Sequence, residues 1–214
     1  VDNLRAIAAF SVLYFHVTNA VNSYPTDLLL RESGKYGHYG VEIFFVISGF
    51  IIPYSMWLAR YAIKNDLGSF ICKRLMRVEP PYIASIIFAI TVGFLVNVAY
   101  GKDIYVYTLP QVASHLFYLT NFLGYQWVNP VYWTLAIEFQ FYFLLAILYP
   151  LVTSPTYRSP LFVMVAVVFL TAGDWAHGTV VYFSPLFVMG VIVALGKVNL
   201  LRSRSAFVML LICF

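Results

Sequence analysis

Two ionisable residues lie on one apolar segment near the start of the chain. The stretch LRAIAAFSVLYFHV, residues 4–17, contains Arg5 and His16 with ten residues between them. Since a helix turns by about 100° per residue, two positions 11 apart return to within about 20° of the same face, about 16 Å apart along the axis. We therefore predict that the two side chains lie along one face of an apolar helix. The cation would be near one end of the helix, and the titratable imidazole would lie deeper in the membrane.

A carboxylate in another apolar segment is the expected partner of this imidazole. Thr134, Glu138 and Tyr142 in YWTLAIEFQFY share one helix face at spacings of four. An ionisable group inside a membrane span costs about 2.5–3.5 kcal/mol on insertion scales, which makes it a functional candidate. Ser48 is a third polar group, in a third apolar segment. Counted from the predicted segment ends, His16, Glu138 and Ser48 lie roughly 10–12 Å deep.

These residues also have structural interpretations. Arg5 can anchor the cytoplasmic end of its helix by extending its charge to the interface. His16 can be a packing histidine bonded to backbone, and Glu138 can simply hold helices together. The functional interpretation is favoured for His16 and Glu138, because they are ionisable groups at one estimated depth. For Arg5 both interpretations stay open.

The rest of the sequence indicates a membrane protein. The chain is 62% hydrophobic and 10% charged, whereas soluble domains average about 25% charged residues. Its mean hydropathy is +0.82. We expect an all-α, polytopic transmembrane helix bundle. About six spans are predicted, with a seventh starting near 206, at residues 4–23, 40–59, 79–99, 131–150, 160–174 and 180–196.

Basic residues set the predicted orientation, since cytoplasmic loops are rich in Lys and Arg. With a cytoplasmic N-terminus and a segment 104–127 that does not cross, 10 basic residues lie inside and 3 outside. The outer ones are Arg31, Lys35 and Lys102. If 104–127 crossed, the split would be 6 and 7, so we predict that it does not. These loops account for the net charge of +4, and no nucleic-acid partner is expected.

The predicted cytoplasmic loop 60–78 contains a candidate phosphate site. Arg74 and Arg77 in FICKRLMRVEPPY are three residues apart and would face the same way on a short helix. Guanidinium pairs suit bidentate recognition of phosphate. A loop that only sets the topology is the alternative. Pro80 and Pro81 are expected to open the third span, because proline is tolerated in the first turn of a helix.

Four motifs, in this order, resemble the membrane-bound acyltransferase-3 family. They are LRAIAAFSVLYFH with Arg5 and His16, GVEIFFVISGF from Gly40 to Phe50, RLMRVEP from Arg74 to Pro80, and WTLAIEFQFY from Trp133 to Tyr142. The family often has an acidic or polar residue after the motif glutamate, where this chain has Phe139. Because the family is usually longer, with about ten spans, we expect residues 1–214 to be a single acyltransferase domain that is incomplete at its C-terminal end.

The resemblance implies a membrane O-acyltransferase. Such an enzyme takes an acyl group from acyl-CoA on the cytoplasmic side, with acetyl-CoA the expected donor, and transfers it to a hydroxyl of a glycan or related acceptor. The expected location is a bacterial inner membrane, with the N-terminus cytoplasmic and the bilayer as partner. No metal is expected, and the sequence does not set the oligomeric state.

The resemblance also implies roles for particular residues. Arg5, Arg74 and Arg77 would hold the phosphates of CoA. His16 would act as a general base or carry the acyl group covalently, supported by Glu138. Ser48, Tyr142 and Trp133 would line the substrate path.

Two other functions remain open. A proton-coupled transporter or flippase for a lipid-linked or acyl substrate also uses intramembrane His and Glu. The sequence shows no inverted repeat of the kind that transporters often have, which favours the enzyme. A purely structural membrane partner is the third alternative, and it does not require aligned polar groups.

Overall fold

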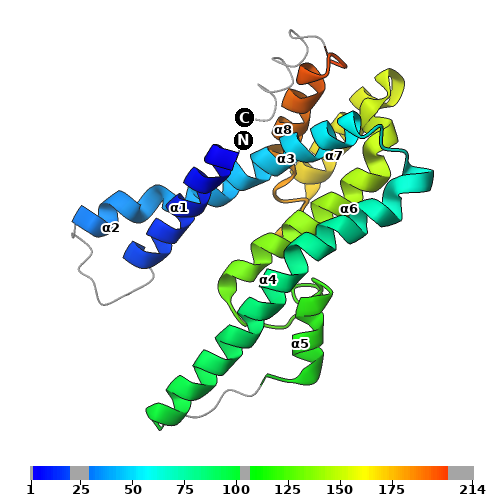
Figure 1. The fold of residues 1–214 in the computed structure, drawn as a ribbon. Coiled ribbons are helices and arrows are strands. Elements are labelled where there is room, and N and C mark those ends of the chain that lie inside the picture. The colour runs from blue at the N-terminus through cyan, green and yellow to red at the C-terminus, as the bar shows by residue number, and fades with distance from the viewer. Residues whose placement is uncertain (1, 20–28, 102–106, 202–214) are drawn as a thin grey trace. The chain divides into compact units, whose positions relative to one another are not determined.

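A computed structural model describes residues 2–19, 29–101 and 107–201 of the chain. The described part is helical and contains no strand (Figure 1), so the predicted all-α class is confirmed. It falls into two compact units, which are described separately. Unit 1 consists of Val1–Tyr61, Tyr149–His177 and Val181–Phe214, and unit 2 of Ala62–Leu148 and Gly178–Val180.

Three segments of the described chain are long and apolar enough to cross a membrane, namely Leu29–Leu58, Ile63–Ala99 and Pro130–Thr153. A bilayer core of about 30 Å takes about 20 helical residues. Helices α7 (Pro155–Thr171) and α8 (Ser184–Lys197) match two further predicted spans but have only 17 and 14 residues. The predicted count of six spans is therefore not confirmed, and the seventh span lies outside the described residues.

Unit 1 begins with α1 (Asp2–Asn19), held against a glycine-rich segment. That segment comprises α2 (Leu29–Gly34), the 3-10 helix η1 (Lys35–Tyr39) and α3 (Gly40–Leu58). Residues three apart eclipse in a 3-10 helix, so Gly34, Gly37 and Gly40 lie along one edge. A Cβ at each would come within 1.9, 2.3 and 2.5 Å of an atom of α1. Only glycine lets this edge approach α1 so closely.

A second pair of glycines lets α3 and α8 cross in direct backbone contact. A Cβ at Gly49 would lie 2.2 Å from the carbonyl oxygen of Phe187, and a Cβ at Gly190 would lie 2.2 Å from that of Val46. Backbone atoms cannot move aside as a flexible side chain can, so neither position accommodates a larger residue. Ser48 precedes Gly49 in α3 and is buried, with 1% of its surface exposed.

A buried arginine joins the end of α6 (Trp133–Thr153) to the residues that follow α8. Arg158 is 4% exposed. Its Nε donates to the carbonyl of Val152 at 2.8 Å, its Nη2 to that of Thr153 at 2.9 Å, and its Nη1 to that of Leu200. The last carbonyls of a helix have no partner within the helix and carry partial negative charge. The guanidinium therefore satisfies two carbonyls at one helix end and a third that lies 42 residues after Arg158 itself.

Unit 2 is built on one long helix, α4 (Ile63–Ala99), of 37 residues. It includes most of the predicted basic loop 60–78 and all of the predicted third span, so the prediction of a loop there is wrong. Pro80 and Pro81 lie inside α4 and not in its first turn. Each removes one backbone hydrogen bond to the carbonyl four residues earlier. The helix nevertheless continues for about 55 Å, which joins its basic and apolar halves directly.

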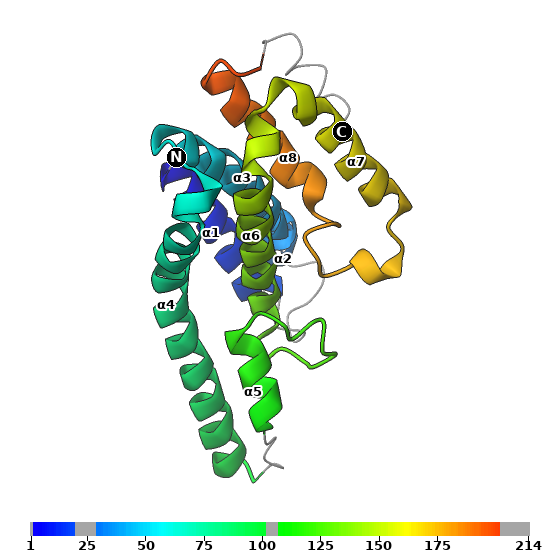
Figure 2. The same ribbon diagram turned by 90° about the vertical axis from the view of Figure 1, so that its right-hand side faces the viewer.

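Helix α6 runs antiparallel to the first half of α4 (Figures 1 and 2). The guanidinium of Arg74 lies 5.5 Å from the ring centre of Tyr142, and Tyr82 meets Tyr132 edge-on at 5.0 Å. Arg74 therefore lies level with Tyr142, which is nine residues, or about 14 Å, after the start of α6 at Trp133. The apolar second half of α4 extends past the start of α6.

Helix α5 (Leu109–Leu116) has 8 residues and is about 12 Å long, too short to span a bilayer. This agrees with the prediction that segment 104–127 does not cross, although residues 102–106 lie outside the described part. His115 is fully buried and joins α5 to the loop after it. Its Nδ1 donates to the carbonyl of Gln111 at 2.8 Å, and its Nε2 accepts from the amide of Val128 at 3.0 Å. Both ring nitrogens are used, so His115 is a structural histidine.

Candidate functional site

The predicted site residues are divided between the two units. Unit 1 contains Arg5, His16 and Ser48, whereas unit 2 contains Arg74, Arg77, Trp133, Glu138 and Tyr142. Within unit 2 the structure brings Arg74, Glu138 and Tyr142 together. The pairing of His16 with Glu138 stays a prediction.

Arg74, Glu138 and Tyr142 line one small cleft, which we call the α4–α6 cleft. It is narrow, with a free volume of about 10 Å³, room for about one water molecule, and its other lining residues are Leu75, Val78, Tyr118, Leu135 and Phe139. A cation, a carboxylate and two phenols therefore converge within mostly apolar walls. A few polar groups among apolar walls are what the lining of a ligand site provides, but the free space here is far below the roughly 300–1,000 Å³ of a small-molecule site.

A hydrogen bond joins Tyr142 to Glu138 within α6. The Tyr142 hydroxyl donates to Oε1 of Glu138, as the spacing of four residues predicts. Tyr142 is 5% exposed, and Glu138 is half-buried. Thr134, predicted on the same face, instead donates to the carbonyl of Val131 at 2.9 Å. The Glu138 carboxylate is therefore oriented by a phenol one turn further along its own helix.

The two arginines of RLMRVEP occupy different environments. The Arg74 guanidinium lies 5.3 Å from the ring centre of Phe70 as well as over Tyr142, and the residue is half-buried. Arg77 is exposed. Positions three apart on a helix differ by about 60° in direction. Arg74 lines the α4–α6 cleft and Arg77 lies at the surface of unit 2, and a shared phosphate site for the two stays a prediction.

His16 lies in the last turn of α1, and its side chain is exposed. It is three residues, or about 4.5 Å, from the end of the helix at Asn19. The predicted depth of about 10 Å assumed a helix that continues to residue 23, and residues 20–28 lie outside the described part. The imidazole meets the ring of Phe15 edge-on at 5.3 Å. Arg5 is half-buried on the same helix, and the choice between a catalytic and a packing role for His16 stays open.

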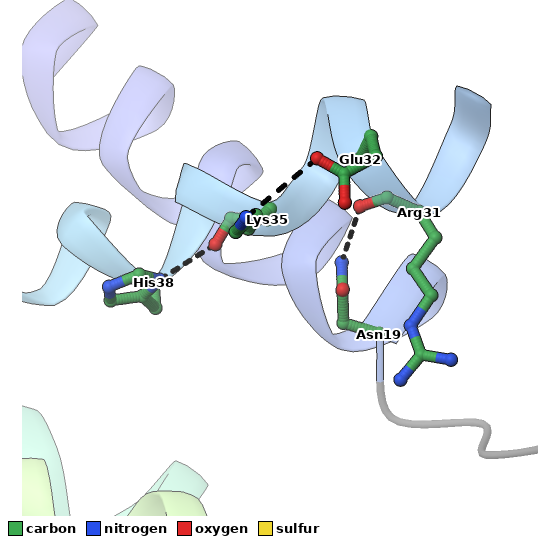
Figure 3. Close-up of polar contacts among 5 residues, drawn as sticks. All are labelled: Asn19, Arg31, Glu32, Lys35 and His38. Carbon is green, nitrogen blue, oxygen red and sulfur yellow. Dashed lines mark hydrogen bonds and ion pairs between the residues drawn. The ribbon is translucent and has the colours of Figure 1, made fainter. Parts of the chain in front are cut away.

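A second histidine, His38, lies against the same phenylalanine. Its ring centre is 5.5 Å from that of Phe15. Its Nδ1 bonds to the carbonyl of Lys35 at 2.8 Å (Figure 3). Since a carbonyl only accepts, Nδ1 holds the proton and Nε2 has the lone pair in the neutral ring. The sequence analysis did not select His38.

Polar contacts hold the glycine-rich segment next to the end of α1. Asn19 donates to the carbonyl of Arg31 at 3.2 Å, and Lys35 pairs with Glu32 at 3.8 Å (Figure 3). The Lys35–Glu32 pair is exposed, with 56% and 61% of the two side chains accessible, so it adds little stability. This ion pair lies within the glycine-rich segment, so the contacts with α1 come from Asn19, from the hydrogen bond between the Tyr14 and Ser33 hydroxyls at 2.7 Å, and from the glycines.

Tyr118 is a cleft residue that the sequence analysis missed. It is 3% exposed, and its ring stacks on Phe139 at 4.8 Å and on Tyr82 at 5.5 Å. Its φ is 56°, in the left-handed region. A bulky residue is uncommon there, at a cost on the order of 1–3 kcal/mol. Tyr118 lies outside all four motifs, so no sequence signal marks it.

Glu79 is a second polar residue near Tyr118. Its Oε1 is buried and has no hydrogen-bond partner. The sequence does offer a signal here, because an acidic residue directly before Pro80 and the apolar half of α4 is unusual. An unpartnered buried oxygen costs about 1–3 kcal/mol, which the fold must offset elsewhere.

Comparisons with known proteins add to this geometry. A family model described as an acyltransferase domain matches residues 1–214. The chain is 28% identical over 164 residues to O-acetyltransferase OatA of Staphylococcus aureus. This alignment covers 71% of this chain and 24% of that protein. It is 26% identical over 151 residues to ORF330 of Acidianus two-tailed virus, covering 71% and 41% respectively.

A further relative is nodulation protein 10 of Rhizobium leguminosarum bv. viciae, 27% identical over 168 residues, with 69% of this chain and 43% of that protein covered. The chain therefore spans less than half the length of each of these three relatives. No solved structure gives a significant match.

Proposed function

Since this chain belongs to the acyltransferase-3 family, whose model matches residues 1–214, we propose that it is the membrane-embedded part of an O-acyltransferase. The enzyme moves an acyl group, acetyl by preference, from cytoplasmic acyl-CoA to a hydroxyl of a glycan or related acceptor. The observation that carries the proposal is the α4–α6 cleft, where two family motifs contribute Arg74, Glu138 and Tyr142. The similarity to a protein named as an O-acetyltransferase supports acetyl as the group.

The proposed chemistry is acyl transfer from a thioester to an alcohol. His16 accepts the proton of the acceptor hydroxyl as its oxygen attacks the thioester carbonyl. The carbon–sulfur bond then breaks, and CoA leaves as a thiolate that takes up the proton. In the alternative, His16 first attacks the thioester and carries the acyl group to the acceptor. Glu138 is proposed to support the imidazolium, and the sequence motifs are the basis for this role.

The proposed donor site uses cations. Guanidinium groups bind phosphate through two parallel hydrogen bonds. Arg77, at the surface, is placed at the phosphates of CoA, while Arg74 in the cleft is placed nearer the thioester. Arg5 is proposed as a further phosphate ligand. The 10-to-3 split of basic residues supports a cytoplasmic N-terminus, and we propose a bacterial inner membrane as the location.

The full-length protein tests the function directly. Purified in lipid and given radiolabelled acetyl-CoA and a soluble oligosaccharide, it should release CoA and label the oligosaccharide. A folded protein that binds acetyl-CoA but transfers nothing would contradict the proposal. Proton-driven movement of a substrate into vesicles, without acyl transfer, would support the transporter instead.

We expect Arg77→Ala to weaken acetyl-CoA binding by about 10- to 100-fold, because a hydrogen bond to a charged group contributes about 1.5–3 kcal/mol. Arg77→Lys should restore only part of the affinity, since the bidentate fork is lost. The measurement is equilibrium binding of acetyl-CoA to the full-length protein. Lys64→Ala is the matched control, an exposed cation of the same helix. Unchanged binding by the double variant Arg74→Ala/Arg77→Ala would show that the pair only sets the topology.

A further inference from the structure

Segment 107–129, which consists of α5 and the loop that leads to the 3-10 helix η2 (Pro130–Tyr132), has polar side chains inside and apolar side chains outside. Four of its five buried residues are polar, namely Gln111, Ser114, His115 and Thr120, none of them more than 4% exposed. Segments that face water normally show the opposite arrangement. Six large apolar side chains of this segment are exposed, and we call them the apolar edge: Leu109, Leu116, Phe117, Leu119, Phe122 and Leu123.

The buried polar side chains pair with the backbone of the loop. Gln111 Nε2 donates to the carbonyl of Gln126 at 3.0 Å, and the amide of Val128 donates to Nε2 of His115 at 3.0 Å. Turns within the loop pair further amides with carbonyls. A loop in water can leave its backbone to the solvent, whereas non-helical backbone at membrane depth must be satisfied within the protein. The internal bonding of segment 107–129 is therefore what a position inside a bilayer requires.

The same segment lies beside the apolar half of α4 (Figures 1 and 2). Tyr118 stacks on Tyr82 of α4 at 5.5 Å, and Trp127 packs against the same buried cluster. Tyr82 is 17 residues, or about 26 Å, before the end of α4 at Ala99. The loop therefore reaches far along a helix that is apolar enough to span a membrane. Over this distance α4 exposes large apolar side chains of its own, among them Ile87, Phe88 and Leu95.

The charge pattern indicates what covers the apolar edge. No Asp, Glu, Lys or Arg occurs between Asp103 and Glu138. Interfaces between proteins usually keep a polar rim around an apolar centre, and this stretch has no charged residue to form one. The segment is also packed against α4, whose exposed apolar side requires the same kind of covering. Lipid acyl chains fit both surfaces.

We propose that α5 and its loop lie inside the bilayer as one part of an interrupted membrane crossing, with lipid acyl chains covering the apolar edge. In this crossing α5 enters along α4 from the side opposite the basic residues Lys73 and Arg77, the loop turns at membrane depth, and α6 continues the crossing. Segment 107–129 is thus embedded although it is too short to span. Because α6 then begins below the surface, Glu138 lies deeper than the roughly 10 Å predicted from sequence. The proposal does not depend on the acyl-transfer activity.

Spin labels test this position on the full-length protein in vesicles of phosphatidylcholine and phosphatidylglycerol. With Cys72 and Cys213 replaced by serine, single labels are attached to Phe122→Cys and Leu123→Cys, at exposed positions where a label displaces no packed side chain. Collisions with oxygen, which concentrates in lipid, are compared with collisions with a water-soluble nickel chelate. Both labels should collide mainly with oxygen.

Two exposed positions of α4 are the matched references. Leu95→Cys lies on the apolar half and should report lipid, whereas Asn65→Cys lies near the start of the helix and should report water. Labels at Phe122 and Leu123 that meet the nickel chelate as often as the label at Asn65 does would place the loop in water. Labels that neither reagent reaches would mean that protein covers the apolar edge. Either result would overturn the proposal.

The depth of α5 separates a crossing from a segment that lies flat on the membrane surface. Leu109 and Leu116 are seven residues apart at the two ends of α5, a distance of about 10 Å along the helix. A label at Leu116→Cys should therefore lie about 10 Å deeper than one at Leu109→Cys. Equal depths would overturn the interrupted crossing. Since none of these measurements uses a substrate, their failure would leave the proposed acyltransferase untouched.

Discussion

His16→Ala should lower the rate of acyl transfer by about 10²- to 10⁴-fold, the usual contribution of a general acid–base group, while acetyl-CoA binding stays nearly normal. The reason is that His16 is exposed at the end of α1 and is proposed to act on the reacting hydroxyl rather than on the phosphates of the donor. The measurement pairs single-turnover acetyl transfer with equilibrium binding of acetyl-CoA, both on the full-length protein.

His38→Ala is the control for this prediction. His38 is exposed and lies against Phe15, as His16 does, so the two variants disturb the same aromatic neighbour. Transfer should be near normal in His38→Ala. If His16→Ala also turns over at the normal rate, His16 is neither the base nor the acyl carrier.

Glu138→Gln separates charge from packing at the second proposed catalytic residue. Glutamine keeps a carbonyl oxygen that accepts the hydrogen bond of Tyr142, but it removes the negative charge that would stabilise an imidazolium. Transfer should therefore fall more than donor binding does. A variant that loses its folded state would instead indicate that the carboxylate mainly holds α6 in the bundle.

Gly190→Val should destabilise unit 1 more than any other single change considered above. A Cβ there would lie 2.2 Å from the carbonyl oxygen of Val46 and 2.6 Å from the backbone of Gly49. Overpacking typically costs about 1–3 kcal/mol and occasionally more, and a clash between two backbones belongs at the upper end. Thermal unfolding in detergent, followed by size-exclusion chromatography, should show a large loss of folded protein.

The matched control for the helix crossing is Gly196→Ala. Gly196 lies in the same helix, and a Cβ there would have no neighbouring atom within 4 Å. Alanine should stabilise the helix by up to about 1 kcal/mol through its higher helix propensity. If Gly190→Val and Gly196→Ala melt alike, the close contact of α3 and α8 is not what holds unit 1 together.

Local features of the fold were predictable from sequence because they depend on neighbours in the chain. The apolar runs located the main helices, and a spacing of four correctly placed Glu138 and Tyr142 on one helix face, where they form a hydrogen bond that had not been predicted. The motif glycines Gly40 and Gly49 were recognised as part of a pattern, but the pattern did not reveal that each permits contact with a different helix. That information depends on which surfaces meet, and hydrophobic periodicity does not specify it.

The predicted helix boundaries were wrong where the local preference of proline conflicts with the helix that the chain forms. Pro80 and Pro81 were interpreted as a helix start, since proline is well tolerated there, yet α4 continues through both. Extending the helix backwards changes the surroundings of Arg74, which packs on Phe70 and Tyr142 instead of lying in a loop. The motif residues were identified, but the sequence did not show that α4 continues through both prolines to the point where Tyr82 packs against Tyr132.

Tyr118 illustrates what no sequence pattern predicts. Its neighbours Tyr82 and Phe139 are 36 and 21 residues away in the chain, and its positive φ occurs in a residue type that rarely adopts it. Its place in the α4–α6 cleft depends on contacts between segments that are far apart in the chain. A search for ionisable residues in apolar segments passes over a tyrosine because tyrosines are common in this chain.

The contacts of Arg158 constrain the order in which the chain matures on the ribosome. Its third carbonyl partner, Leu200, is 42 residues further along, which at about 5–20 residues per second corresponds to roughly 2–8 s of synthesis. Until then the nascent guanidinium has only the end of α6 to bind. We therefore expect the segment containing α7 to reach its final packing only after α8 has been made, because one of the three carbonyl partners of Arg158 is absent until then.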